Sequence, residues 1–212
     1  GSKFLNSGPG FGGSCFKKDI LNLVYLSEFF GLPEVAAFWE SVVNLNSWHQ
    51  NRISRLITKK LFGTLSNKKI VVLGFAFKAN TNDTRESAAI QICKNLLDEE
   101  AYLVIHDPKV KFEQIEIDLE KNVLENDSID KNKLNISKGG NWHFADNLNK
   151  IFENADAVII LTEWDIYKKL NWQEVSKIMR RPSWIFDTRS ILNTNDIKEL
   201  GLNFWQIGDG IG

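Results

Sequence analysis

A cysteine and two charged residues lie close together directly after a glycine-rich stretch. Cys15 follows the run 8–14, Gly-Pro-Gly-Phe-Gly-Gly-Ser, and Lys18 and Asp19 come three and four residues after it. The apolar run that follows predicts a helix that begins near Ser14, with Ser14 as its N-cap. A helix start favours an anion, because its first N–H groups are unpaired, so the Cys15 thiolate would be stabilised there. The spacing also places Cys15, Lys18 and Asp19 on one helical face.

These residue types fit a particular chemistry. A thiolate attacks an aldehyde carbon, and the resulting thiohemiacetal becomes a thioester when it loses hydride to a nicotinamide. A nearby carboxylate can guide the water that hydrolyses the thioester. The alternative is a buried structural cysteine after a glycine turn. The coincidence of glycine loop, helix start and flanking charges favours the reactive interpretation.

The same glycines match the spacing of a nucleotide-binding pattern but not the structural context that it requires. Gly8, Gly10 and Gly13 spell G-x-G-x-x-G. The dinucleotide fingerprint requires a strand before it and an acidic residue about 20 positions later, at the end of a second strand. Neither is predicted here, because the segment 29–33 at that distance is Phe-Phe-Gly-Leu-Pro. We therefore expect no dinucleotide cradle at these glycines.

Two helices are predicted after the cysteine. The first runs from about residue 15 to 30, with Gly31 as a C′ residue, and Pro33 opens the second. The second helix extends to about residue 61, which gives about 28 residues and roughly 40 Å. Its apolar residues exceed one face, so it needs partners on several sides. It is either a buried intrachain helix or a linker that also forms a homodimer seam, and we favour the seam.

Strands and helices alternate through the rest of the chain. This pattern predicts an α/β fold in which the helical segment 1–62 is followed by a Rossmann-like parallel sheet, residues 63–212, with helices on both faces. Strands are expected at 69–74, 101–106, 157–161, 183–186 and 204–207, helices at 86–99, 144–154, 167–179 and 195–200, and an exposed loop, with a short strand at 135–136, at about 120–142.

Cationic and aromatic residues follow two of these strands. Phe77 and Lys78 come after the first strand, and Arg189 follows the strand that ends at Phe186. Ligands of open parallel sheets bind beyond the carboxyl ends of the strands. An arginine fork and a lysine point charge can hold a phosphate, and Phe77 can wall a base. Each residue alone would be an ordinary solvated side chain, but together they favour an anionic nucleotide ligand.

Composition excludes several classes of protein. The chain has 212 residues, 43% hydrophobic and 25% charged, and a net charge of −1. A folded core is expected, and a general nucleic-acid surface is not. No apolar run is long enough for a membrane span, and His49, His106 and His143 show no metal-ligand spacing. The two cysteines, Cys15 and Cys93, favour a reducing cytoplasm over a disulfide framework.

Several motifs together resemble the UDP-glucose 6-dehydrogenase family. The segments 4–6 (Phe-Leu-Asn), 10–16 (Gly-Phe-Gly-Gly-Ser-Cys-Phe) and 18–19 (Lys-Asp) resemble its catalytic-cysteine segment. The segments 74–78, 83–87 and 186–189 resemble its uridine-nucleotide domain. The resemblance covers nearly all of this chain, whereas the amino-terminal NAD domain of the family has no counterpart in it.

The resemblance implies roles for individual residues. Cys15 would be the nucleophile, Asp19 the water-activating carboxylate and Lys18 an electrostatic support. The implied contacts to the sugar nucleotide are Phe4, Leu5, Asn6, Gly10, Phe11, Gly12, Phe16, Phe77, Lys78 and Arg189. Arg85 would reach the phosphates of the NAD cofactor, with Cys15 and Lys18 on the nicotinamide side. The chain departs from the usual family pattern at Gly8-Pro9, Lys17, Asn82 and Thr188.

Three functions follow as hypotheses. The first is a portion of a UDP-glucose 6-dehydrogenase, which oxidises UDP-glucose to UDP-glucuronate with two NAD and one water. This chain alone would then bind a UDP-sugar without turnover and would form a dimer or a higher homo-oligomer through its long helix. The alternatives are a stand-alone UDP-sugar-binding module and a portion of a related nucleotide-sugar dehydrogenase.

Overall fold

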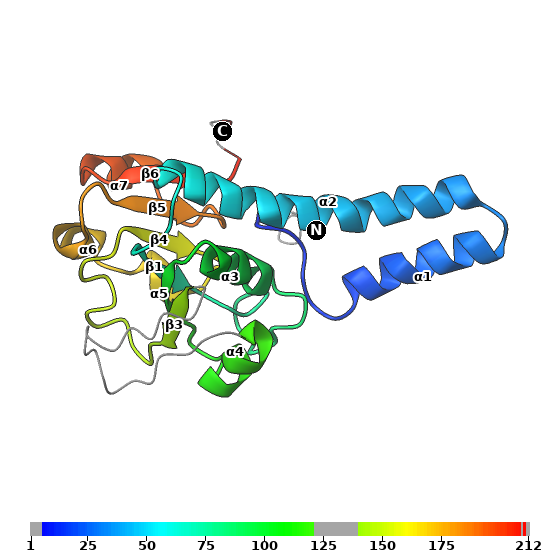
Figure 1. Cartoon of the computed structure of the whole chain (residues 1–212), viewed down its shortest axis with the longest axis horizontal. Helices are drawn as coiled ribbons and strands as arrows, with labels where there is room; N and C mark the ends of the chain where they lie inside the picture. The colour runs from blue at the N-terminus through cyan, green and yellow to red at the C-terminus, as the bar shows by residue number, and fades with distance from the viewer. Residues whose placement is uncertain (1–5, 121–139, 209, 211–212) are drawn as a thin grey trace.

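The first two helices are antiparallel, and the first of them extends beyond the rest of the molecule together with the amino-terminal half of the second (Figure 1). In this computed structural model, which describes residues 6–120, 140–208 and 210, they are α1 (Phe16–Phe29) and α2 (Pro33–Lys60). Gly31 has a φ of 70°, and its N–H and that of Leu32 donate to the carbonyls of Glu28 and Ser27. This Schellman motif ends α1 at the predicted glycine. The two predicted helices are confirmed, and α2 has the predicted 28 residues.

A six-stranded parallel sheet follows the helices. Its strands are β1 (Lys69–Leu73), β2 (Tyr102–His106), β3 (Asn141–Phe144), β4 (Ala157–Ile160), β5 (Trp184–Asp187) and β6 (Asn203–Gln206). They lie in the order β3-β2-β1-β4-β5-β6. The chain therefore reverses direction across the sheet between β1 and β4, which are neighbours in register from Ile70 with Ala157 to Leu73 with Ile160. Such a topological switch point is where open α/β sheets bind ligands.

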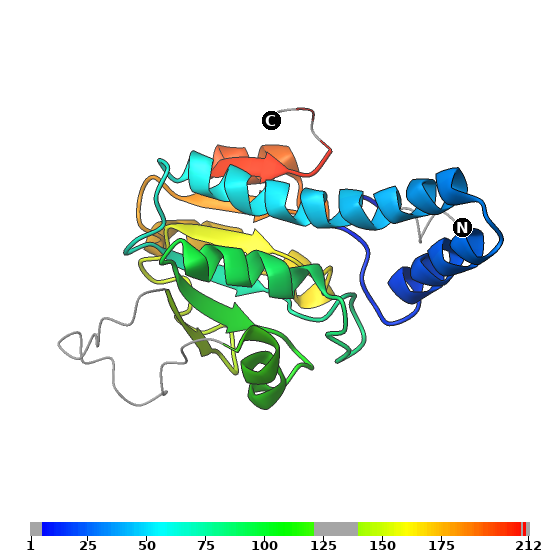
Figure 2. The same ribbon diagram turned by 45° about the vertical axis from the view of Figure 1, so that its right-hand side comes forward.

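Helices cover both faces of the sheet, as predicted (Figure 2). One face packs against α2, α3 (Ala88–Asp98) and α4 (Phe112–Leu119), and its core includes Ile57, Ile92 and Ile115. The other face packs against α5 (Asp165–Lys168), α6 (Trp172–Ile178) and α7 (Thr194–Glu199), and its core includes Tyr167 and Val175. The carboxyl-terminal half of α2 thus belongs to the sheet's core, while its amino-terminal half pairs with α1.

The helix expected at 144–154 is wrong. Phe144 closes β3, and the segment after it forms turns. The Asn147 side chain accepts from the Asn149 backbone N–H at 2.9 Å, and Lys150 and Asn154 have positive φ. An asparagine that bonds its own backbone competes with a helix, and left-handed residues interrupt one.

Smaller differences concern the other helices. The helix expected at 86–99 begins at Ala88, because the Ser87 hydroxyl caps it by accepting from Ala89. The helix expected at 167–179 is two helices, α5 and α6, because the Asn171 side chain starts a new one by accepting from Glu174. The helix α4 was not predicted. Residues 121–139, which include most of the expected loop and its short strand, lie outside the described residues.

None of the helices in the described ranges combines the length and apolar character that crossing a membrane requires.

Candidate functional site

The glycine-rich segment, residues 7–15, lies between α2 and the carboxyl edge of the sheet; we call it the cysteine loop (Figure 2). From α2, the Asn46 side chain bonds both backbone groups of Phe11, and the His49 ring Nε2 lies 3.1 Å from the Gly8 carbonyl oxygen. From the sheet side, the Arg85 carbonyl accepts from the Gly13 N–H at 2.8 Å. The loop is therefore fixed on two sides by segments far away in the sequence.

Close approach explains two of the glycines. A Cβ on Gly12 would lie 2.4 Å from the Glu86 carbonyl oxygen, which no side chain can tolerate. Gly10 has a φ of +125°, and a Cβ there would lie 2.6 Å from Asn46 Oδ1. Both positions require glycine for the loop to reach α2 and the sheet at the same time. Residues 6–15 contain no strand.

Cys15, and not Ser14 as predicted, is the N-cap of α1. The backbone of Cys15 is already in the right-handed helical region, and its carbonyl accepts from the Asp19 N–H at 2.8 Å. The Ser14 hydroxyl caps no N–H group; it lies 3.7 Å from Cys15 Sγ. Cys15 is an exposed free cysteine, and Lys18 and Asp19 are also exposed. The thiol thus stands at the helix start, as expected, although one position earlier in the helix.

An exposed arginine lies on the same side as the thiol. Arg85 makes a two-point ion pair with Asp83, with Nε 2.9 Å from Oδ1 and Nη2 2.7 Å from Oδ2, while its side chain remains 68% exposed. The pKa of Arg85 is raised by the hydrogen bond to Asp83 and, to a smaller extent, by the charge of Cys15. The same hydrogen bond lowers the pKa of Asp83. Asp83 therefore orients a guanidinium that still has access to a ligand near Cys15.

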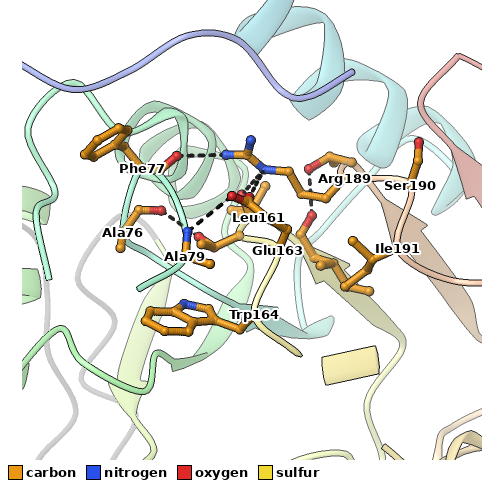
Figure 3. Close-up of polar contacts among 12 residues, drawn as sticks. Ala76, Phe77, Ala79, Leu161, Glu163, Trp164, Arg189, Ser190 and Ile191 are labelled. Carbon is orange, nitrogen blue, oxygen red and sulfur yellow. Dashed lines mark hydrogen bonds and ion pairs between the residues drawn. The ribbon is translucent and has the colours of Figure 1, made fainter. Parts of the chain in front are cut away.

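Arg189 occupies the switch point of the sheet (Figure 3). Its Nε donates to the Leu161 carbonyl at 2.8 Å, and its Nη2 donates to the Phe77 carbonyl at 3.0 Å. Glu163 Oε2 lies 3.3 Å from Nε, and Glu163 Oε1 accepts from the Ala79 N–H at 3.2 Å. The side chain is 15% exposed, and burial lowers the pKa of Arg189, with Glu163 opposing that shift. Arg189 thus joins the segments that follow β1, β4 and β5.

The cysteine loop meets Arg189 directly. The guanidinium Nη1 lies 3.0 Å from the position that a Cβ on Gly8 would take, and the Ser7 hydroxyl is 3.3 Å from that of Ser190. On the other side of the loop, the Phe77 ring lies against Gly13. Lys78 is exposed, and its ammonium lies 5.2 Å from the centre of the Phe77 ring. The cysteine loop therefore contacts both Arg189, which follows β5, and Phe77, which follows β1.

Most of the predicted site residues come together here. Gly10, Phe11 and Gly12 lie in the loop, and the Phe11 ring packs edge-on against Phe16, with centroids 4.7 Å apart. Asn6 is exposed at the start of the described chain, and Phe4 and Leu5 lie outside the described residues.

Sequence reasoning missed Glu163, Asn46 and His49. Glu163 follows β4, so the rule of strand ends that selected Arg189 would also have selected it. No sequence signal marks Asn46 or His49, because a polar residue on a long helix is ordinarily a solvated one.

Two family models match the chain. Residues 71–194 match the UDP-binding domain of the UDP-glucose/GDP-mannose dehydrogenase family, and residues 1–48 match its central domain. The match to the UDP-binding domain spans β1 to the start of α7 and includes Phe77, Lys78 and Arg189.

Individual relatives agree with the family models. The chain is 44% identical to UDP-glucose 6-dehydrogenase 4 of Arabidopsis thaliana over 98% of its own length, and 44% identical to the UDP-glucose 6-dehydrogenase of Bos taurus over the same share. It spans 44% and 41% of those relatives. A solved UDP-glucose dehydrogenase from Pyrobaculum islandicum superposes on 94% of the chain with a TM-score of 0.68 and 27% identity, and the match covers 38% of that structure. The chain belongs to the UDP-glucose/GDP-mannose dehydrogenase family.

Proposed function

We propose that this chain is the cysteine-loop and UDP-binding portion of a UDP-glucose 6-dehydrogenase, which oxidises UDP-glucose to UDP-glucuronate with two NAD and one water. The observation that carries the proposal is the contact between the cysteine loop and Arg189, with Nη1 3.0 Å from the Cβ position of Gly8. A nucleophile and a phosphate-binding cation then serve one ligand. The names of the relatives that match 98% of the chain support UDP-glucose as that ligand.

The diphosphate would bind at the edge formed by Arg189 and Lys78. The two bonds from Arg189 to backbone carbonyls fix the orientation of its guanidinium, so little side-chain entropy is lost on binding. Lys78 adds a mobile point charge. Phe77 would wall the base, and Asn6, Gly10, Phe11, Gly12 and Phe16 would line the sugar side, together with Phe4 and Leu5.

Cys15 would form a bond through Sγ to the aldehyde carbon at the sugar's C6. The chemistry that NAD supplies when bound is two oxidations, first of the C6 alcohol of UDP-glucose to the aldehyde and then of the Cys15 adduct. The product of the second oxidation is a thioester, and Asp19 would accept one proton of the water that hydrolyses it, which leaves a carboxylate and the Cys15 thiol. Lys18 would stabilise the negative charges of this cycle.

The described residues fit NAD only in part. Arg85 is exposed, and the charge of Cys15 contributes to raising its pKa, so the two side chains lie near each other. Arg85 therefore fits the role of binding one phosphate of the cofactor. The glycines of the cysteine loop do not form a cradle, because they are held against α2 and Glu86. Cys15 and Lys18 would face the nicotinamide, whose remaining contacts must come from elsewhere in the complete enzyme.

A second copy of the chain would cover the helical hairpin. Large apolar side chains are exposed along it: Leu21, Tyr25, Phe29, Phe30, Val35, Phe38, Leu45 and Trp48. Contiguous apolar surface of this kind is rare on monomers. We assign residues 1–62 to the cysteine loop and dimerisation segment, and 63–212 to the UDP-binding domain. Cys15 and Cys93 are both free, which suits a cytoplasmic protein.

A calorimetric titration of the 212-residue chain with UDP tests the proposal. UDP should bind, and GDP should bind more weakly. Equal affinity for UDP and GDP would instead favour a related nucleotide-sugar dehydrogenase. If UDP does not bind, the substrate-site assignment fails.

A further inference from the structure

One side chain of α2 is paired with the backbone of the cysteine loop. Asn46 Oδ1 accepts from the Phe11 N–H at 2.9 Å, and Asn46 Nδ2 donates to the Phe11 carbonyl at 3.1 Å. The side-chain amide therefore uses both an acceptor and a donor on a single residue, as a neighbouring strand would. Asn46 is half-buried, so water competes only partly for these two bonds.

The cysteine loop passes close to Asn46 on one side and is bonded to the sheet on the other. Gly10 approaches so closely that a Cβ would lie 2.6 Å from Asn46 Oδ1 and 3.3 Å from Gln50 Nε2. On the opposite edge, the Gly13 N–H is bonded to Arg85, and Cys15 begins α1 two residues later. Asn46 is one of two anchors on the α2 side, since His49 meets Gly8, and Phe11 is the residue through which Asn46 acts.

We infer that Asn46 is a positioning residue of this site. It holds the backbone of Phe11, and thereby fixes both the Phe11 ring at the ligand surface and the path of the loop to Cys15. Asn46 itself touches neither the thiol nor the cations at the strand ends among its described contacts. The effect on the ligand rests on the proposed function, whereas the effect on the loop does not.

The replacement Asn46→Asp tests this pairing with little change of shape. A carboxylate still accepts from the Phe11 N–H, but its second oxygen then faces the Phe11 carbonyl oxygen, and the two repel. A protonated carboxyl can donate to that carbonyl and restores the pair, so the defect should diminish at low pH. Asn46→Ala removes both bonds at every pH. Asn44→Asp, at an exposed position of the same helix, adds the same charge away from the loop.

Two measurements report on the full 212-residue chain. The first is amide hydrogen exchange of the peptide that contains Phe11, expressed as the ratio of variant to wild-type rate at pH 8.0 and 5.0. For Asn46→Asp we expect a ratio of about ten at pH 8.0 and a smaller ratio at pH 5.0, where more of the carboxyl is protonated; for Asn46→Ala we expect a raised ratio at both. The second is the affinity for UDP at pH 8.0, which should fall about tenfold in Asn46→Asp and not change in Asn44→Asp.

The outcomes separate the two proposals. If the Phe11 peptide exchanges as slowly in Asn46→Asp as in Asn44→Asp, the positioning role is wrong, even if UDP binding to the wild-type chain supports the proposed function. If Asn46→Asp speeds exchange in the Phe11 peptide but the wild-type chain does not bind UDP, the proposed function is wrong and the positioning role of Asn46 is supported. If Asn46→Asp does not fold, two measurements on Asn46→Ala replace it: the exchange ratio of the Phe11 peptide and the iodoacetamide labelling rate of Cys15. If both equal the wild-type values, the positioning role is wrong.

Discussion

The guanidinium of Arg189 donates a 3.0 Å hydrogen bond to the carbonyl of Phe77, across 112 positions of sequence. Arg189 follows β5 and Phe77 follows β1, and β4 lies between these strands. The bond to Leu161, after β4, completes the connection. A side chain that spans three strand ends cannot be removed without loosening the segment that carries Phe77 and Lys78.

The replacement Arg189→Ala should therefore weaken UDP binding. Loss of one charge-assisted phosphate contact costs roughly 1.5–3 kcal/mol, or about ten- to a hundredfold in affinity. Arg189→Lys should recover only part of it, because an ammonium cannot reproduce the planar fork. Calorimetry with UDP measures the effect, with Arg55→Ala, an exposed arginine of α2, as the control. Unchanged affinity in a folded Arg189→Ala chain would remove Arg189 from the site.

The two cysteines should differ strongly in reactivity. Cys15 is exposed at the start of α1, whereas Cys93 is fully buried in α3, and burial raises the pKa of the Cys93 thiol. Because the thiolate is the nucleophile, iodoacetamide should label Cys15 rapidly in the native chain and Cys93 only when the chain opens. Peptide mass spectrometry gives both rates from one sample. Equal rates would show that Cys15 has no special environment.

The chain should dimerise through the exposed stripe of α2. Phe38 and Leu45 are seven positions apart on one helical face and are 61% and 62% exposed. Replacing both by Asp should give a monomer, because two charges would then have to be buried in the seam. Lys59→Asp, at an exposed position in the carboxyl-terminal part of α2 that packs on the sheet, should leave the assembly intact. Sedimentation velocity distinguishes these results, and a wild-type chain that is monomeric at high concentration contradicts the prediction.

Stability should decrease as pH falls below about 6.5, the unfolded pKa of histidine. Burial lowers the pKa of His106, whose Nδ1 lies 3.0 Å from the Tyr167 hydroxyl, although Asp107 and Asp146 oppose the shift. Burial also lowers the pKa of His143. Between about pH 6.5 and the lowered pKa of the native histidine, the unfolded chain binds more protons than the native one. Within that range each histidine lowers the unfolding free energy by up to about 1.4 kcal/mol per pH unit.

Urea unfolding at pH 7.5 and 5.5 measures this dependence. The variant His106→Gln should be less stable at pH 7.5 but should lose less on acidification than the wild type. A wild-type chain with the same unfolding free energy at both values would argue against buried neutral histidines.

Apolar patterning was sufficient to predict much of the fold. The runs at 69–74 and 157–161 have no competing interpretation as loops, and Gly31-Leu32-Pro33 marks the turn between the helices through its backbone preferences alone. β3 was missed because its four residues, Asn-Trp-His-Phe, are half-polar and pair only with β2. Such an edge strand owes its existence to its neighbour and not to its own sequence.

The site was predictable to the extent that its residues follow strand ends or begin a helix. Arg189 and Cys15 satisfy those rules, and Glu163 satisfies the first of them. Asn46 satisfies none, because its two bonds to Phe11 exist only after α2 and the cysteine loop have been brought together. Local propensity carries no information about contacts of that kind.

Binding and turnover should separate in this chain. UDP-glucose should bind, because Arg189 and Lys78 lie at one edge of the sheet with the cysteine loop against them. NADH should not form, because hydride transfer needs a nicotinamide held against the sugar carbon, and Arg85 alone, exposed and tied to Asp83, cannot orient a dinucleotide. The glycines of the cysteine loop cannot orient it either, because they lie against Asn46, Glu86 and Phe77. Absorbance at the NADH band, with UDP-glucose and NAD in excess, tests the second half while calorimetry tests the first. Sustained NADH production by the purified 212-residue chain would mean that it holds a complete cofactor site, whereas binding without turnover would agree both with a substrate-binding portion of the enzyme and with a UDP-sugar-binding module.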